Sequence, residues 1–238
     1  RPEARNAMTF AVDDRLAQIA RDANGDAALR AIVFRGAGGE AFVSGTDIAQ
    51  FREFKTDGDA LAYEQRISTV IDAVSRIAVP TIAAIDGSCV GGGFGIAAAC
   101  DLRIATPGSK FGFPLAKALG NCLSMTSLSG LVALVGAARA KELLLTARLV
   151  EAPEAQAFGL IHEVAAGDAF AARVDELAQM VASYAPLTLR ATKEALRRMR
   201  ERMIPEGSDL ITLCYGSADF KEGVAAFLEK RAARWEGR

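Results

Sequence analysis

A β-type apolar segment, Pro80-Thr-Ile-Ala-Ala-Ile-Asp-Gly87, runs into the glycine cluster Val90-Gly91-Gly92-Gly93-Phe94-Gly95. An alanine-rich helical segment, residues 96–100, follows at once. Glycine lets a ligand approach the main chain closely, and the first amides of a helix have no partner within that helix. A strand, glycines and a helix start in this order can therefore aim a backbone N–H group at an anion or a polarised oxygen.

The chain before this stretch is predicted to hold two helices and a strand. Thr9 can cap a helix that continues to about Asp22, and residues 29–34 form a short apolar strand. Asp59 opens a longer helix, which Pro80 ends, because apolar residues recur there at helical spacing. The residues expected to face inward on these two helices are Leu16, Ile19, Ala20, Ile67, Val70, Ile71, Val74 and Ile77.

The chain after the glycine cluster becomes increasingly helical. A buried helix and the strand 102–105 come first, and short extended and turn pieces follow over residues 110–120. From residue 137 onward the pattern is almost wholly helical, with one strand around 160–164. Strand–helix units followed by helices predict an α/β fold, with a parallel sheet, covering helices and a helical C-terminal region.

The bulk composition excludes several classes of partner. The formal net charge is −1, which gives no support for nucleic acid or an anionic membrane surface as partner. No apolar run approaches the roughly 20 residues needed to span a bilayer. The four cysteines are far apart and form no CxxC pair, and there is one histidine, so no metal site is expected. We interpret the cysteines as reduced thiols of a cytoplasmic protein.

The spacing of the glycines argues against a nucleotide site. A dinucleotide fingerprint needs G-x-G-x-x-G, but its third glycine would fall on Ile96 or Ala98, depending on which pair starts the motif. No Lys-Ser or Lys-Thr follows, as a phosphate-binding P-loop requires, and the lipase-type G-x-S-x-G elbow is also absent. A nicotinamide-dependent dehydrogenase is therefore disfavoured.

A second glycine-rich loop, residues 36–45, ends in Ser44-Gly45-Thr46-Asp47 and could offer a partner amide. Two convergent amides form an oxyanion hole, suited to a thioester oxygen that becomes an enolate or a tetrahedral oxyanion. The alternative is that the glycines only allow close packing of strand against helix.

Segments along nearly the whole chain match one family pattern in order. They are Arg1-Pro-Glu-Ala-Arg-Asn-Ala-Met8, Ala41-Phe-Val-Ser-Gly-Thr-Asp-Ile48, Pro80 to Gly87 with Gly91-Gly92-Gly93 and Ala99-Cys-Asp-Leu-Arg-Ile-Ala105, Pro186-Leu-Thr-Leu-Arg-Ala-Thr-Lys193, and Phe220-Lys-Glu-Gly223 with Ala226-Phe-Leu-Glu-Lys-Arg231. The first three resemble the RPxxxNAM, AFxAGxDL and PVIAAVxG…GGG…CDxRIA elements of the crotonase (enoyl-CoA hydratase/isomerase) family. Each motif is weak alone, but their order and spacing together are specific.

This resemblance implies a crotonase-like ββα superhelix over residues 1–185 and a C-terminal helical trimerisation region over 186–238. It also implies a homotrimer or a dimer of trimers, and an acyl-CoA thioester as substrate, with coenzyme A as part of that substrate and no separate cofactor. The two oxyanion donors would be the backbone amides of Thr46 and Gly92. The expected substrate or CoA contacts are Ala41, Phe42, Ser44, Asp47, Ile48, Phe220, Phe227 and Lys230. In the family a first strand precedes RPxxxNAM, so the chain from Arg1 is expected to lack that strand.

The chain departs from the family at both catalytic carboxylates. Hydratases of the family use two glutamates as acid and base, one after the glycine triplet and one in an FGxPE segment. These positions hold Gly95 and Leu115 here, and neither side chain can transfer a proton. Enoyl-CoA hydration by two glutamates is therefore not expected.

Replacement groups are sought in Lys117-Ala-Leu-Gly-Asn-Cys-Leu-Ser124. Some isomerases and dehalogenases of the family carry an aspartate where Ser124 aligns here, so Asn121 and Ser124 are the candidate catalytic side chains, unless they only cap the next helix. Cys122 is interpreted as a packed thiol. Glu64 is a remote carboxylate that we expect on a solvated helix face.

Two hypotheses remain. The first is an acyl-CoA enzyme that stabilises an enolate-type oxyanion, labelled hydratase or isomerase by resemblance, with decarboxylase, thioester hydrolase and lyase chemistry also open. The second is a non-catalytic acyl-CoA binder that keeps the oxyanion hole.

Overall fold

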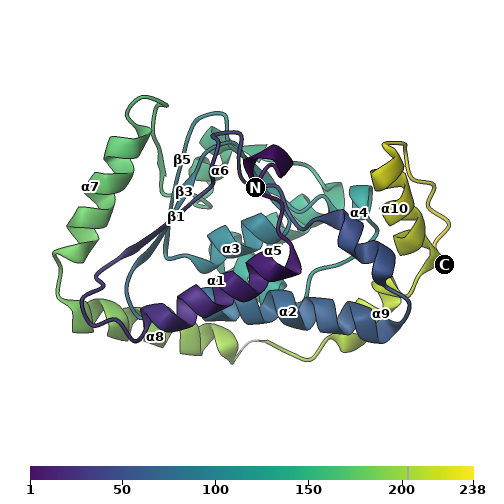
Figure 1. Cartoon of the computed structure of the whole chain (residues 1–238), viewed down its shortest axis with the longest axis horizontal. Helices are drawn as coiled ribbons and strands as arrows, with labels where there is room; N and C mark the ends of the chain where they lie inside the picture. The colour runs from purple at the N-terminus through teal and green to yellow at the C-terminus, as the bar shows by residue number, and fades with distance from the viewer. Residues whose placement is uncertain (203) are drawn as a thin grey trace.

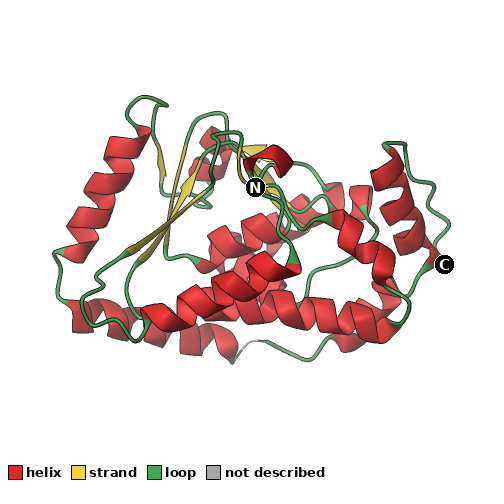
Figure 2. Cartoon of the chain, in the orientation of Figure 1, coloured by secondary structure: helices red, strands yellow, loops and turns green. Residues whose placement is uncertain are grey.

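The computed structural model describes residues 1–202 and 204–238, and shows a mixed α/β fold (Figures 1 and 2). In chain order the elements are η1 (Pro2–Ala4), α1 (Phe10–Ala23), β1 (Ile32–Arg35), β2 (Ala41–Val43), η2 (Ile48–Glu53), α2 (Asp57–Ser75), β3 (Thr81–Ile85), β4 (Ser88–Val90), α3 (Gly92–Ala99), β5 (Leu102–Ala105), β6 (Lys110–Gly112), α4 (Leu115–Ala118), α5 (Met125–Thr146), β7 (Val150–Glu151), α6 (Ala152–Ala157), β8 (Glu163–Val164), α7 (Phe170–Ala182), α8 (Pro186–Glu201), α9 (Ser208–Tyr215) and α10 (Ala218–Glu229).

Two four-stranded sheets organise the chain. The first has the order β1-β3-β5-β8 and is parallel throughout, which confirms the predicted parallel sheet. The second has the order β2-β4-β6-β7, and only its β6–β7 pair is antiparallel. Alternate residues of β3 point to opposite faces, so Ile82 and Ala84 pack against α7 while Ala83 and Ile85 enter the main core. Figure 1 shows α7 on one side of these strands and α1 and α2 on the other.

The predicted start of the first helix at Thr9 is confirmed, whereas the second helix starts before the predicted Asp59. The Thr9 hydroxyl accepts a hydrogen bond from the Val12 amide at 3.4 Å, so the predicted cap is confirmed. The cap of α2 is Thr56, and the Asp59 carboxylate accepts from the Thr56 amide at 2.8 Å. This capping box starts the second helix earlier than predicted.

The predicted inward face of α1 is wrong at Ile19. The Ile19 side chain is 41% exposed, whereas the buried residues of α1 are Asp13, Ala17 and Ala20. Small side chains let α1 approach α2 closely, and Ile19 instead borders a surface groove beside β1 and β2. A buried aspartate therefore occupies the face that was expected to be apolar.

Short strands account for the other differences from prediction. β2 lies inside the region expected to be a glycine-rich loop, and β7 interrupts the region expected to be helical. β2 can pair with β4 because Gly36 and Gly87 lack side chains. A Cβ atom on these two residues would lie 2.0 Å and 2.1 Å from the carbonyl oxygens of Ala41 and Glu40.

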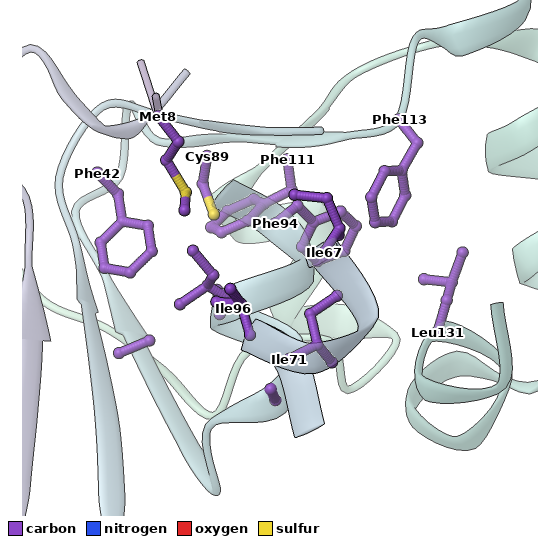
Figure 3. Packing of buried hydrophobic residues seen from close by; sticks show 14 of the residues in the cluster. Met8, Phe42, Ile67, Ile71, Cys89, Phe94, Ile96, Phe111, Phe113 and Leu131 are labelled. Carbon is purple, nitrogen blue, oxygen red and sulfur yellow. The ribbon is translucent and has the colours of Figure 1, made fainter. Parts of the chain in front are cut away.

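The main hydrophobic core surrounds α3. Phe94 of α3 stacks on Phe113 with ring centroids 4.8 Å apart. Figure 3 shows Phe94 and Ile71 near the middle of this cluster, with Phe42 on one side and Leu131 on the other. The glycine cluster therefore begins a helix that lies inside the protein, since all residues of α3 except Gly92 and Ala98 are buried.

No helix among residues 1–202 and 204–238 is both long and apolar enough to cross a membrane. The division of the chain at 185/186, a strand before Arg1 and the role of the C-terminal region in trimerisation stay predictions.

Candidate active site

The two glycine-rich loops lie against each other, as the sequence predicts. A Cβ atom on Gly92 would lie 3.5 Å from the Thr46 hydroxyl oxygen, and one on Gly91 would lie 3.6 Å from the Gly45 Cα. Gly45 and Gly91 have φ values of 111° and 56°, which favour glycine. Thr46 and Gly92 are thus neighbouring residues, and the amide of neither donates a hydrogen bond to another described residue.

The structure gives different reasons for a glycine at position 92 and at position 93. Gly93 is required for packing, because a Cβ atom there would lie 2.3 Å from the Val43 carbonyl oxygen. Gly92 is different, since its Cβ would meet only the Thr46 hydroxyl, at an ordinary contact distance. It is the first residue of α3, so its N–H group has no partner within the helix. Close packing therefore explains Gly93 but does not explain Gly92.

The positions of the two absent glutamates are filled by apolar packing. A Cβ atom on Gly95 would lie 3.0 Å from the Cδ1 atom of Ile71, which is tighter than an ordinary contact. Leu115 begins α4 and packs against the main core. A side chain at position 95 therefore requires the end of the Ile71 side chain to move.

Glu64 of α2 is buried, so the expectation of a solvated helix face is wrong. Its side chain is 8% exposed and accepts a hydrogen bond from the Tyr215 hydroxyl. The Ser124 amide also donates to it. Burial raises the pKa of the Glu64 carboxyl to about 7, and the hydrogen bonds from Tyr215 and Ser124 offset only part of this effect.

Ser124 and Asn121 both adjoin this carboxyl. The Ser124 hydroxyl caps α5 by accepting from the Ser127 amide at 3.3 Å, so capping is confirmed for Ser124. It also accepts from the Ser68 hydroxyl at 3.1 Å. Asn121 does not cap the helix, and its Nδ2 atom donates to the Tyr215 hydroxyl at 2.9 Å. Its Oδ1 atom is buried without a hydrogen-bond partner among the described residues.

Tyr63 connects this polar cluster to the loop that contains Thr46. Its hydroxyl lies 2.7 Å from the hydroxyl of Thr46, and its ring centroid is 6.2 Å from that of Tyr215. The cluster of Tyr63, Glu64, Asn121, Ser124 and Tyr215 therefore extends from the loop at Thr46 to the C-terminal helices.

A cavity of about 350 Å³ opens beside Tyr215, between η2, the start of α2, α9 and α10. Its aromatic and basic lining residues are Phe51, Phe54, Tyr215, Phe220, Arg52, Lys55 and Lys221. Such a wall suits a ligand that is apolar in part and anionic in part. Of the polar cluster, Tyr215 lines this cavity.

The expected CoA contacts are spread over different environments. Ala41 and Phe42 are buried in β2, and Ile48 is buried in η2. Ser44 and Asp47 are half-buried on either side of Thr46. Phe220 lines the cavity, whereas Phe227 and Lys230 are exposed and do not line it. The roles of all eight residues stay predictions.

The sequence analysis did not identify Tyr63 or Tyr215 as site residues. It placed Glu64 on a solvated helix face because the residue is charged. A signal for Glu64 was present, because Glu64, Ile67 and Ile71 share one face of α2 at helical spacing. Tyr215 carried no such signal, since its contact with Glu64 joins positions 151 residues apart. The four cysteines are free thiols, and Cys122 donates to the Leu210 carbonyl at 3.4 Å.

Comparison with known proteins points to acyl-CoA chemistry. The family model described as enoyl-CoA hydratase/isomerase matches residues 1–238. The enoyl-CoA isomerase/hydratase fer4 of Mycosarcoma maydis is 34% identical over 251 residues, which cover 100% of this chain and 90% of the relative. A crystal structure of an enoyl-CoA hydratase/carnithine racemase from Magnetospirillum magneticum has a TM-score of 0.81 at 33% identity, covering 100% of this chain and 90% of that one. A methylmalonyl-CoA decarboxylase in complex with 2-nitronate-propionyl-CoA has a TM-score of 0.89 at 28% identity, covering 100% and 92%.

Proposed function

The chain belongs to the enoyl-CoA hydratase/isomerase family, and on that premise we propose that it is an enzyme acting on acyl-CoA thioesters through an enolate. The thioester oxygen would accept hydrogen bonds from the amides of Thr46 and Gly92. The observation that carries this proposal is the adjacency of Thr46 and Gly92, whose amides have no acceptor among the described residues. Preorganised amides of this kind stabilise the charge that develops on the oxygen in the transition state.

Isomerisation, a proton shift along the acyl chain, fits the site better than hydration. Hydration by the family's mechanism needs two carboxyl groups, and Gly95 and Leu115 supply neither. A proton shift through an enolate needs one group that removes a proton and returns it to another carbon. Thioester hydrolysis and lyase reactions lack a specific observation in their favour.

A second candidate is decarboxylation of a malonyl-type thioester. The likeness to a methylmalonyl-CoA decarboxylase supports it. Loss of CO₂ yields the enolate directly, so the first step needs the oxyanion donors but no base. A binder without catalytic activity is the remaining alternative.

The test compares Gly92→Pro with Gly92→Ala. Proline is well tolerated at the first position of a helix and removes the N–H donor, whereas alanine keeps the donor and adds a Cβ in ordinary contact with the Thr46 hydroxyl. On a panel of 2-enoyl-, 3-enoyl- and malonyl-type thioesters, we expect Gly92→Pro to lower kcat about 10²–10³-fold. Gly92→Ala should stay within a few-fold of the wild type.

Equal activity of the two variants, with both folded, would show that the Gly92 amide is not an oxyanion donor. Thioester binding without turnover of any panel member would favour the non-catalytic binder. Which panel member reacts separates isomerisation from decarboxylation.

We further propose that coenzyme A enters only as part of the substrate and that neither a metal nor another cofactor takes part. Nucleic acid and membrane are not proposed as partners, and the proposed location is the cytoplasm. A homotrimer or a dimer of trimers is proposed because Leu187, Leu196 and Met199 of α8 expose apolar side chains on an amphipathic helix.

A further inference from the structure

Glu64 has the properties of a reactive group rather than of a structural ion pair. It is buried, and no cation is recorded among its interactions with the described residues. Its contacts are uncharged donors, the Tyr215 hydroxyl and the Ser124 amide. A buried carboxyl held by neutral donors is costly to fold around, and such groups gather at functional sites.

Glu64 adjoins residues that contact or line the two parts of the proposed site, the Thr46 loop and the cavity beside Tyr215. The preceding residue, Tyr63, contacts the side chain of Thr46 through its hydroxyl at 2.7 Å. The residue that donates to the carboxyl from α9, Tyr215, lines the cavity of about 350 Å³. Glu64 therefore follows a residue that contacts the Thr46 loop, and its carboxyl lies directly behind Tyr215, which lines the cavity.

The hydrogen bond from the Ser124 amide also places the Glu64 carboxyl beside the segment 121–124. The sequence predicts the replacement catalytic group within residues 121–124, where the Ser124 hydroxyl caps α5 and the Asn121 Nδ2 atom donates to Tyr215, so neither side chain offers a carboxyl group. The structure brings the Glu64 carboxyl to this place from another helix. We propose that Glu64 is the catalytic carboxyl group, which exchanges a proton with the carbon next to the thioester carbonyl; this inference rests on the proposed function.

The step balances without a co-reactant. The carboxylate of Glu64 removes a proton from the carbon, so a C–H bond breaks and an O–H bond forms on Glu64. The electron pair moves into the enolate, whose oxygen is held by the amides of Thr46 and Gly92. The same carboxyl then returns the proton, either to its original carbon or to the carbon two positions further along an unsaturated chain.

The titratable neighbours of Glu64 do not change charge near pH 7. The titratable groups that face it are Tyr63 on its own helix, Tyr215 on α9 and Cys122 in the segment before α5. Burial raises the pKa of each of the three well above its ordinary value, so each stays neutral near pH 7. Glu64 is therefore the group of this cluster whose charge changes near neutrality.

The experiment measures deuterium incorporation into butanoyl-CoA in D₂O by mass spectrometry. This readout needs proton removal but neither hydration nor decarboxylation. We expect the wild type to incorporate deuterium, with a rate that rises with pH through a midpoint near 7. Glu64→Gln should lose about 10²–10⁴-fold in rate while it still binds butanoyl-CoA, and Glu64→Asp should keep part of the activity.

Tyr215→Phe tests the role without removing the carboxyl. The Tyr215 hydroxyl stabilises the ionised form, so its loss should raise the pKa of Glu64 and move the midpoint of the rate profile to higher pH. A purely structural role would lower the rate without moving the midpoint. Asp72→Asn, two turns further along α2 on an exposed position, is the matched control and should leave rate and midpoint unchanged.

The possible failures are distinguishable. Wild-type exchange that Glu64→Gln retains would overturn the role of Glu64 and leave the proposed function standing. Butanoyl-CoA binding by the wild type without exchange, and without turnover of any panel thioester, would overturn both. A midpoint unchanged in Tyr215→Phe would overturn the assignment of the pH dependence to Glu64.

Discussion

Replacement of Asp13 by asparagine should stabilise the protein, and by far more at high pH than at low pH. Asp13 lies on the face of α1 that packs against α2 and has no exposed surface. Neither oxygen of its carboxyl has a hydrogen-bond partner among the described residues. Burial raises the pKa of Asp13 to about 7 and outweighs the opposing attraction of Arg66.

The size of the effect follows from the difference between the two pKa values of this carboxyl. An aspartate in an unfolded chain titrates near 3.9, and the buried group titrates at about 7. Between these values the folded state binds more protons than the unfolded state, so the free energy of unfolding falls as pH rises and levels off above about 7. A difference of about 3 between the two pKa values corresponds to about 4 kcal/mol. Asparagine cannot ionise, so Asp13→Asn escapes this loss.

The assay is urea unfolding of the wild type and of Asp13→Asn at about pH 4 and about pH 8. The stability gain should be about 4 kcal/mol larger at the higher pH. Comparing the gain at two pH values cancels any change in packing that asparagine introduces. Asp22→Asn is the matched control, because Asp22 lies on the same helix, is exposed and is not among the charges that act on Asp13; the change in stability that it causes should be nearly the same at both pH values. An equal gain for Asp13→Asn at both pH values would refute the reasoning.

Three further outcomes are expected. Gly95→Ala should destabilise the Ile71→Val protein less than it destabilises the wild type, because valine lacks the Cδ1 atom that lies 3.0 Å from the added Cβ. A double-mutant cycle measured by urea unfolding should show a coupling of about 1–2 kcal/mol between the two positions. Strict additivity of the two changes would contradict the packing described. Lys221→Ala should weaken binding of an acyl-CoA thioester several-fold, with the loss shrinking at high salt, because phosphates would meet this basic wall; calorimetry that shows no change would exclude the cavity as the CoA site. Leu196→Asp together with Met199→Asp should dissociate the proposed trimer into monomers by light scattering, whereas an unchanged mass would place the interface elsewhere.

Local signals made much of the fold predictable. β5 covers the predicted residues 102–105, and the cap of α1 at Thr9 is the predicted one. Both depend on interactions among neighbouring residues, which the sequence displays directly. The adjacency of the two glycine-rich loops was also predictable, through the resemblance of their motifs to the crotonase family.

Features that depend on distant partners were not predictable. β2 is a strand of three residues that forms because β4 lies beside it, and β7 forms because β6 does. The burial of Asp13 and Glu64 likewise depends on which helices pack together, because propensity alone places charged residues on a solvated face. The apolar positions around Glu64 indicated its burial, but its charge outweighed them in the prediction.

If Glu64 is the catalytic carboxyl, as proposed, one face of α2 relates to both the new acid and the glycine at position 95. Ile71 and Glu64 lie two turns apart on one face of α2, which packs against α3. At one level this face inserts an isoleucine where a glutamate at position 95 would need room, and at the other it presents a carboxyl to the Ser124 amide. Gly95→Glu alone should therefore not restore a hydratase, since its side chain would meet Ile71. A restored pair of acids requires Ile71 to become smaller at the same time, so α2 and α3 have to change together.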